Sequence, residues 1–482
     1  MVLLILLVLP LIGSLILAII GDRKLAYEFN VVASGATFIA GIFLAIEVYS
    51  KGSLLIWNDY FLVDAFNVYL AVLTSFVSFT TAMFSRRYMK REREHGRVGH
   101  RAMRFYHTMF QLFIFAMLLC LLTNNVGILW IAMELATLST VLLVSLYRTP
   151  TAIEAAWKYF ILCGVGIAQA LFGTVLLYFA AEKVLGEGGK SLLWTNLVQN
   201  SGQLNPTILS LAFVFLFVGY GTKVGLVPMH NWLPDAHSEG PTPISAVLSG
   251  LLLNVALYAL VRCKIIVDGA THTHHAGYIM MIFGLLSVLV GAFSLLRQKD
   301  IKRLFSYSSI EHMGITTFAF GLGGSIATYG ALLHMLVHSL TKSSIFFTVG
   351  HAAQMHGTQE IVKIKGLFRG SPWVGWGLMF GVLAIIGMPP FGIFISEFFI
   401  LTATIKSAPY AAPFLLLGLV VTFAAILHKI QPMVAGEPPA YQKHFKVANF
   451  PVIMHLVLVL IIGLFLPVFL NNWFHKAVEI LI

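Results

Sequence analysis

Residues 223–253 read KVGLVPMHNWLPDAHSEGPTPISAVLSGLLL, a stretch that places a lysine and two helix-breaking prolines between apolar segments. Pro228 and Pro234 interrupt the helix that the apolar run 206–229 predicts, because proline removes a backbone donor. Backbone groups freed inside a membrane must face protein or water. The stretch therefore predicts a discontinuous membrane helix with Lys223 at its break.

The composition of the whole chain agrees with a membrane location. Of 482 residues, 58% are hydrophobic and only 11% are charged, and the mean hydropathy is +0.87. These values are typical of a polytopic membrane protein and exclude a soluble enzyme. The net charge of +11 reports topology and not a nucleic-acid partner, since Lys and Arg concentrate in short loops.

Hydropathy predicts an all-α protein, a single membrane domain over 1–482 with fourteen spans. No loop is long enough for a soluble domain. The predicted spans lie near 2–20, 29–48, 61–84, 105–122, 126–147, 159–180, 206–229, 242–262, 276–295, 305–322, 327–352, 373–403, 410–432 and 451–470.

The basic residues orient these spans. The largest cluster lies between Arg86 and Arg104, and most of the other Lys and Arg residues fall in loops on the same side. The positive-inside rule then puts this side in the cytoplasm and both chain termini outside. The three cysteines are far apart in the sequence, which argues against a disulfide framework or an iron–sulfur site.

Lys223 and Lys342, with Glu134 and Glu397 as their acidic counterparts, fall well inside predicted spans. Each costs about 2.5–3.5 kcal/mol to insert unless it is paired or hydrated. They require a polar interior. One interpretation is two structural ion pairs that lock helices together; the other, which intramembrane charges generally favour, is an ion or proton route.

Residues 332–347 read LLHMLVHSLTKSSIFF and place His334, His338 and Lys342 at i, i+4 and i+8, on one helical face. Histidine titrates near neutral pH, so the stripe favours a proton relay. Two histidines at this spacing also suit zinc or a haem. No acidic residue stands between them as in a zincin helix, however, and the sequence identifies no third ligand.

Two further stretches add titratable groups. Residues 300–315, DIKRLFSYSSIEHMGI, contain Glu311 and His312, which point about 100° apart on a helix, so at most one faces the stripe fully. Residues 387–399, GMPPFGIFISEFF, place two prolines before Glu397 and predict a second broken helix. Paired breaks favour inverted repeats of a transporter.

These stretches together resemble the antiporter-like membrane subunits shared by respiratory complex I, Mrp antiporters and group 4 membrane hydrogenases. The resemblance covers about 105 to 430. It is greatest to component F of hydrogenase-4 and to the middle antiporter-like subunit of complex I. It implies two inverted five-helix repeats, 105–262 (helices four to eight) and 276–432 (helices nine to thirteen), with helices seven and twelve broken.

The resemblance also implies site residues. Glu134 and Lys223 match the family's glutamate and lysine on helices five and seven, a pair associated with proton affinity in one half-channel, and Glu397 matches the charged residue of helix twelve. Asn254 departs from the lysine that complex I relatives often have on helix eight, so that a link from Lys223 to His338 needs water or another histidine. The expected proton-translocating set is Glu134, Lys223, His312, His334, His338, Lys342 and Glu397.

The sequence thus predicts a proton-translocating subunit of a redox-driven complex, a complex I-like NADH/quinone oxidoreductase or an energy-converting hydrogenase. It would hold no cofactor or metal of its own and would sit in the cell inner (plasma) membrane, bound to other membrane subunits, a peripheral soluble module and lipid. Two alternatives remain open. One is an Mrp-type cation/proton antiporter subunit, and the other is the proton channel of a membrane complex that drives carbon dioxide hydration.

Overall fold

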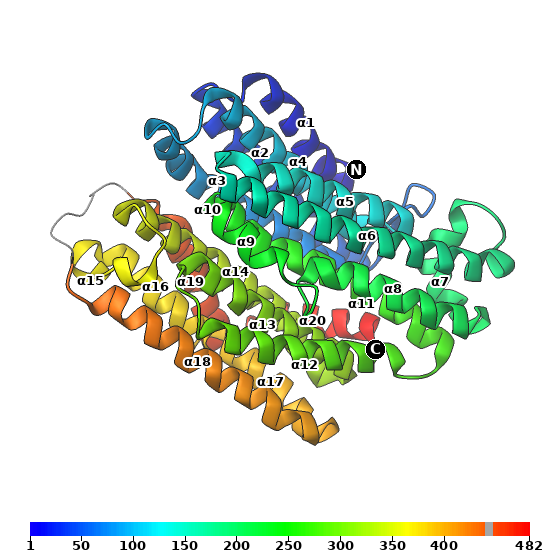
Figure 1. The fold of residues 1–482 in the computed structure, drawn as a ribbon. Helices are drawn as coiled ribbons and strands as arrows, with labels where there is room; N and C mark the ends of the chain where they lie inside the picture. The colour runs from blue at the N-terminus through cyan, green and yellow to red at the C-terminus, as the bar shows by residue number, and fades with distance from the viewer. Residues whose placement is uncertain (439–446) are drawn as a thin grey trace.

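The chain folds into a helical bundle, described here by a computed structural model for residues 1–438 and 447–482 (Figure 1). The first half contains α1 (Val2–Ile20), α2 (Leu25–Lys51), α3 (Ala65–Glu94), α4 (His100–Leu122), α5 (Val126–Val144), α6 (Pro150–Leu185), α7 (Trp194–Gln199), α8 (Pro206–Val224), α9 (Trp232–Glu239) and α10 (Thr242–Val247). The second half contains α11 (Leu253–Thr271), α12 (His275–Leu295), α13 (Ile301–Leu322), α14 (Gly324–His356), α15 (Leu367–Gly370), α16 (Pro372–Ile385), α17 (Gly392–Ser407), α18 (Ala412–Ala435), α19 (Asn449–Leu464) and α20 (Val468–Leu481).

The predicted helical, polytopic character is confirmed. Ten helices in the described residues are long and apolar enough to cross a membrane, or eleven if the bent pair α19 and α20 counts as one span. A small antiparallel hairpin of β1 (Leu54–Ile56) and β2 (Phe61–Val63) precedes α3. The span predicted to start at 61 therefore starts as a helix only at Ala65, because Asp64 caps it and accepts from the amide of Asn67.

Two predicted spans differ in shape from the observed helices. The predicted span 242–262 is divided into α10, a π-helical turn at Leu248–Leu252, and α11. The predicted span 451–470 crosses a bend of 78° between α19 and α20. Pro467 stands directly before α20, and hydropathy could not reveal the bend because both helices are apolar.

The two predicted helix breaks are present. Helix α8 ends at Val224 and α9 begins at Trp232, so Pro228 lies in the non-helical segment between them. Pro234, the other predicted breaker, lies in the first turn of α9, where a missing amide donor costs little. Helix α16 ends at Ile385 and α17 begins at Gly392, on either side of the paired prolines.

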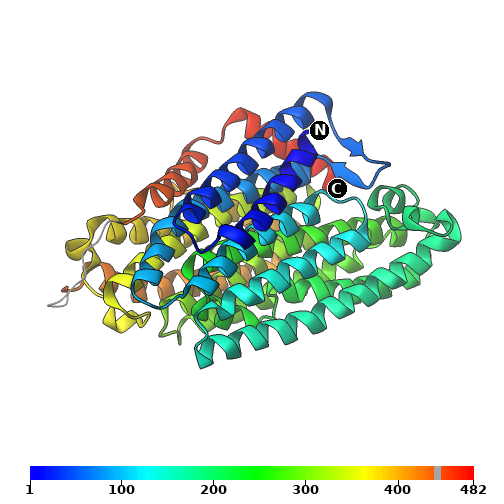
Figure 2. The ribbon, with the colours of Figure 1, turned by 90° about the horizontal axis from the view of Figure 1, so that it is seen from above.

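The helices are arranged around a buried centre. In Figure 1, α1, α2 and α4 to α6 lie on one side of α10, α11 and α14, and α12, α17 and α18 lie on the other. The segment Thr242–Thr271 is entirely buried where it is most apolar. Both chain termini lie toward the same end of the bundle, away from the loop that joins α3 to α4 (Figures 1 and 2).

Glycines bring neighbouring helices into close contact. A Cβ at Gly284 on α12 would stand 2.6 Å from the amide nitrogen of Phe318 on α13, and one at Gly314 would stand 2.7 Å from the carbonyl oxygen of Gly284. Such small residues let backbones approach in membrane bundles. The close contact fixes α13, which carries the buried titratable residues Lys302, Glu311 and His312.

Candidate functional site: a buried polar axis

Lys223 and Glu134 form the first part of the site. Lys223 lies in the last turn of α8, is fully buried and donates to Thr137 Oγ1 on α5. Its Nζ is 3.9 Å from Glu134 Oε2, and the Glu134 side chain remains 22% exposed. The predicted pair is therefore brought together, with the carboxylate on the accessible side and the ammonium inside.

The break after Lys223 has a local partner for its freed backbone. Gly225 takes a positive φ of 81° and turns the chain out of α8. The indole nitrogen of Trp232 then donates to the carbonyl of Thr222 over 2.8 Å. Trp232 also stacks on Tyr159 at 4.5 Å between ring centroids. These contacts hold the discontinuous helix in a defined shape.

His237 on α9 is completely buried, which corrects its expected surface position. The loop count placed it at the inner surface with Asp235 and Glu239. Those two are partly exposed as expected, and Asp235 pairs with Arg303. His237 instead points inward because α9 is a helix and turns it away from both carboxylates. The charges of Lys302 and Lys342 both act on its imidazole.

The central helix links the two halves of the bundle through neutral polar groups. Asn254 Nδ2 on α11 donates to Ser339 Oγ on α14 over 2.7 Å. One turn earlier, Ser249 and Ser309 hydroxyls are 2.7 Å apart. Both Ser249 and Gly250 lie in the π-helical turn, a distortion frequent at functional sites. Asn254 therefore serves as a fixed polar bridge and carries no proton of its own.

Lys342 on α14 is the buried cation of the second half. Its Nζ donates to the carbonyl of Phe305 over 2.9 Å and lies 5.6 Å from the centre of that ring. The acidic group that acts on it is Glu311 on α13. Glu397 lies with His312 and His334.

Three histidines cluster next to this lysine. The ring of His312 lies 5.1 Å from that of His334 and 5.4 Å from that of His338, and the last two rings are 6.2 Å apart. His312 Nδ1 and His334 Nε2 form a hydrogen bond of 3.0 Å. The predicted stripe on α14 thus exists as one face, and His312 joins it from α13.

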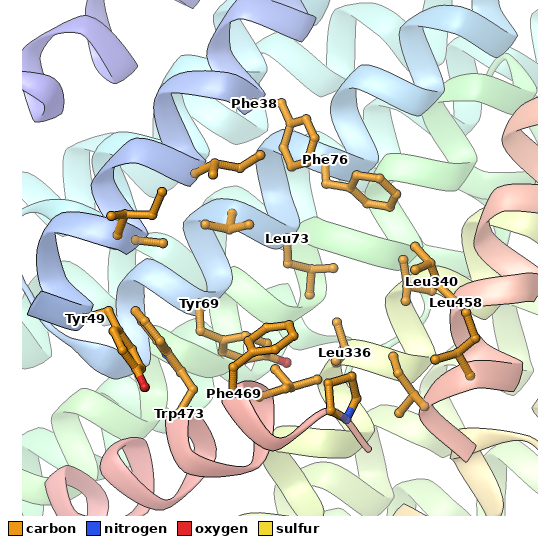
Figure 3. A pocket seen from close by; sticks show the side chains of 18 residues that line it. Phe38, Tyr49, Tyr69, Leu73, Phe76, Leu336, Leu340, Leu458, Phe469 and Trp473 are labelled. Atoms are coloured by element: carbon orange, nitrogen blue, oxygen red, sulfur yellow. The ribbon is translucent and has the colours of Figure 1, made fainter. Parts of the chain in front are cut away.

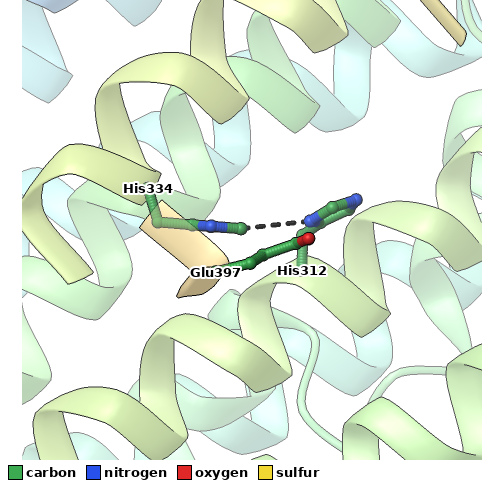
Figure 4. Close-up of side chains that lie close together, drawn as sticks. All are labelled: His312, His334 and Glu397. Carbon is green, nitrogen blue, oxygen red and sulfur yellow. Dashed lines mark hydrogen bonds between the residues drawn. The ribbon is translucent and has the colours of Figure 1, made fainter. Parts of the chain in front are cut away.

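Glu397 reaches the histidines from α17 (Figure 4). The candidate donor atoms of His312, His334 and Glu397 all lie within 4.8 Å of one another. Its neighbour Ser396 forms a 2.9 Å hydrogen bond with His334 Nδ1. The second helix break has a direct role here, because a side chain at Gly387 would collide with the Glu397 carboxylate.

A polar cavity of about 400 Å³ opens at the end of the bundle that carries Arg97 of the basic loop. Glu239 and Lys302 line it. Lys302 is buried and donates to the carbonyls of Ser238 and Gly240, at the end of α9. The sequence placed Lys302 in or beside an inner loop. In the structure its side chain is buried because the ammonium binds the carbonyl groups at the C-terminal end of α9.

A second, larger cavity of about 620 Å³ is apolar (Figure 3). Phe38 and Phe76 lie on one side of it, and Leu458, Phe469 and Trp473 lie on the other. None of the expected proton-translocating residues lines it. Its walls are almost entirely apolar, and the polar groups of Tyr69 and Trp473 are bonded to backbone carbonyls, so it does not suit a chain of water molecules.

Two members of the axis were missed by sequence reasoning. Glu311 is fully buried with its Oε2 3.4 Å from His312 Nε2, although helix geometry suggested that adjacent residues diverge. The side chains of Glu311 and His312 are long enough for their ends to approach each other even though they leave the helix in different directions. His237 was missed because a short helix after a proline break looks like a loop. The signal that the sequence carries is the spacing of Asp235 and Glu239, which lie four residues apart and share one helical face, so that His237 falls on another.

The part of the chain that contains the polar axis matches a known protein family. A family described as NADH:quinone oxidoreductase/Mrp antiporter, TM, matches residues 123–424, which include all seven expected site residues. The chain belongs to this family. The predicted resemblance is confirmed, and this antiporter-like chain is a membrane subunit of the complex I and group 4 hydrogenase kind.

Relatives of this antiporter-like chain come from several complexes. The hydrogenase-4 component F homolog of Methylacidiphilum infernorum (isolate V4) is 47% identical over 468 residues, 97% of each protein. NADH-quinone oxidoreductase subunit M of Pseudomonas aeruginosa is 33% identical over 279 residues, 57% of this chain and 53% of that subunit. In fold, a chain of the membrane-bound sulfane sulfur reductase, an archaeal respiratory membrane complex, matches with a TM-score of 0.90 and 23% identity, over 99% of this chain and 97% of that one.

Proposed function

We propose that this chain translocates protons across the plasma membrane as part of a redox-driven complex, either a hydrogenase or a complex I-like oxidoreductase. The observation that carries the proposal is the buried axis itself. Titratable side chains from α5, α8, α9, α13, α14 and α17 follow one another through the protein interior. A purely structural set of ion pairs would not need histidines such as His338, whose ring nitrogens have no hydrogen-bond partner among the described residues.

The electrostatics of Lys223 and Glu134 provide a switch. A nearby carboxylate stabilises a buried ammonium, whereas burial alone favours the neutral amine. If a conformational change in the complex moves Glu134 away from its position 3.9 Å from Lys223 Nζ, the ammonium loses its partner and releases its proton. The two groups are coupled, so they titrate as a pair.

The inner cavity supplies a route for the released proton. It reaches Lys302, whose charge acts on His237 together with that of Lys342. The buried imidazole of His237, whose ring nitrogens have no hydrogen-bond partner among the described residues, is our candidate to compensate for Asn254, which cannot carry a proton. From Lys342 the axis continues through His338, His312 and His334 to Glu397, the partly exposed group at its far end.

The finer architecture belongs to the same proposal. We place fourteen spans in the membrane, counting α8 with α9 and α16 with α17 as single broken spans. The two inverted repeats are 105–262 and 276–432, each with one broken helix. The termini lie outside, other membrane subunits and lipid contact the outer helices, and a peripheral module supplies the electron transfer. All redox centres belong to the partners.

The orientation can be tested by cysteine labelling. Glu94, in the basic loop, and Glu187, in the loop after α6, are both exposed, while the native cysteines 120, 163 and 263 are all buried. In intact cells, an impermeant thiol reagent should label Glu187→Cys and leave Glu94→Cys unlabelled until the membrane is permeabilised. Labelling of Glu94→Cys in intact cells would show that the basic loop lies outside and would contradict the proposed orientation.

A second prediction concerns Glu134. Glu134→Gln keeps the shape and hydrogen-bonding capacity of the side chain but removes the charge that acts on Lys223. Proton pumping by the assembled complex in vesicles should fall about two- to tenfold while assembly is retained. Glu182→Gln, on the same face of the membrane but outside the axis, is the control. Normal pumping with Glu134→Gln would mean that the charge of Glu134 is not needed for transport and that Glu134 and Lys223 form a structural ion pair.

An Mrp-type antiporter subunit is the second candidate, favoured by the family description, which includes Mrp antiporters. A subunit that powers carbon dioxide hydration is the third. Mass spectrometry of the intact complex separates them. Copurification of iron–sulfur subunits supports the redox-driven assignment. Absence of such subunits together with sodium-dependent proton movement supports the antiporter. A zinc-bearing soluble partner supports the complex that hydrates carbon dioxide.

A further inference from the structure

Three side chains from three helices converge at the end of the polar axis: His312 on α13, His334 on α14 and Glu397 on α17 (Figure 4). We propose that they form a binding site for a zinc ion, and that zinc bound there stops proton transfer along the axis. The binding site stands on the geometry alone. The inhibitory effect rests on the proposed function.

The donor set is the one that zinc selects. Two imidazoles and one carboxylate are typical of zinc sites with three protein ligands and an open fourth position. Magnesium and calcium, in contrast, prefer a full set of oxygen ligands. Nitrogen donors on a tetrahedral zinc ion lie about 3.3 Å apart, and His312 Nδ1 and His334 Nε2 are 3.0 Å apart. Small side-chain rotations would admit the ion.

The second nitrogen of His334 is hydrogen-bonded, and the second nitrogen of His312 has a carboxylate nearby without a hydrogen bond to it. His334 Nδ1 bonds to Ser396 Oγ over 2.9 Å, and His312 Nε2 lies 3.4 Å from Glu311 Oε2. Histidines that bind metals commonly donate their other ring N–H to such a hydroxyl or carboxylate, which fixes the tautomer and the ring orientation. The two nitrogens that face each other, His312 Nδ1 and His334 Nε2, share one hydrogen bond, which a zinc ion bound between them would replace.

His338 differs from this pair, although it lies in the same stripe. Neither of its ring nitrogens has a hydrogen-bond partner among the described residues. The i, i+4 spacing of His334 and His338 suggested these two as a possible pair of metal ligands. In the structure their ring centroids are 6.2 Å apart. The structure instead pairs His334 with His312, and it supplies Glu397 as the third ligand that the sequence did not identify.

The charges around the cluster compensate a divalent cation. Glu397 and Glu311 each supply a carboxylate, and both histidines bind metal in their neutral form. Space for the Glu397 carboxylate exists because Gly387 has no side chain, in the break between α16 and α17. An imidazole nitrogen that binds zinc cannot exchange protons, and the ion would also tie α13, α14 and α17 together. Both effects would stop transfer through the axis.

Direct binding to the purified complex tests the site. Because His272, His274 and His275 are exposed and offer other imidazole ligands to zinc, all three are first changed to asparagine. Zinc-65 binding and zinc X-ray absorption are then compared with and without His334→Gln. The site predicts one additional ion per complex with mixed histidine and carboxylate ligands, absent in the His334→Gln variant. Ser396→Ala should weaken binding about tenfold, and His428→Gln, which is exposed on α18, should leave it unchanged.

The outcomes separate the site from the function. Equal zinc binding with and without His334→Gln, or a zinc spectrum without nitrogen ligands, would overturn the site whatever the transport activity. Zinc that binds as predicted but leaves proton uptake unchanged in vesicles would overturn the inhibitory role and count against the histidines as part of the proton route. Zinc that binds and inhibits only when His334 is present supports both parts.

Discussion

Replacing Lys223 with methionine should reduce proton uptake by the assembled complex at least about tenfold. The substitution keeps a long side chain but removes the ammonium that α8 presents to Glu134 and Thr137. It also removes a buried charge, so the chain should remain folded and assembled. The measurement is the initial rate of redox-driven proton uptake into vesicles at equal subunit abundance.

Lys183→Met is the matched control, because Lys183 is an exposed lysine near the end of α6 and lies outside the axis. It should leave the uptake rate unchanged. A Lys223→Met complex that assembles normally and pumps at the control rate would remove Lys223 from the proton route.

Replacing Arg262 with methionine should destabilise the chain by about 3–5 kcal/mol, because it leaves a buried carboxylate without its partner. Arg262 and Asp64 are both 2% exposed, and their closest atoms are 2.5 Å apart. The guanidinium also lies 4.3 Å from the Trp194 ring. A thiol-reactive dye that reports exposure of the three buried cysteines on heating measures the loss.

Two further variants isolate the ion pair. Arg262→Met combined with Asp64→Asn removes both charges and should recover much of the lost stability. Lys264→Met breaks a more exposed pair with Asp268 on the same helix and should cost less than about 1 kcal/mol. If Arg262→Met melted at the same temperature as Lys264→Met, the pair would not be a structural anchor.

Periodic and apolar features were predictable from the sequence because they depend on local chemistry. The helix breaks follow from proline geometry at Pro228 and Pro389, and the face shared by His334, His338 and Lys342 follows from the helical repeat. Each expected range contains a helix in the structure, and the family assignment rests on the same long motifs. Length and composition identify ten or eleven helices able to cross the membrane within residues 1–438 and 447–482.

Contacts between distant segments were not predictable. The sequence places Arg262 at the outer end of a predicted span and Lys302 in or beside an inner loop, since a sequence does not distinguish a solvated cation from one that contacts a distant carboxylate or helix end inside the protein. The pairing of Glu397 with two histidines depends on where α17 resumes after its break. Glu311 is likewise buried beside the histidines because α12 packs closely against α13 at this position. The geometry of a single helix does not predict such a contact.

The central claim is that Lys223 carries and releases a proton, and Lys223→Arg tests it most directly. Arginine keeps the positive charge near Glu134 but does not release its proton in a protein. The deciding measurement is the initial rate of proton uptake into vesicles that contain the assembled complex with Lys223→Arg, compared with wild type at equal subunit abundance. We predict a rate as low as that of Lys223→Met; a rate close to wild type would contradict the account and make Lys223 an electrostatic fixture.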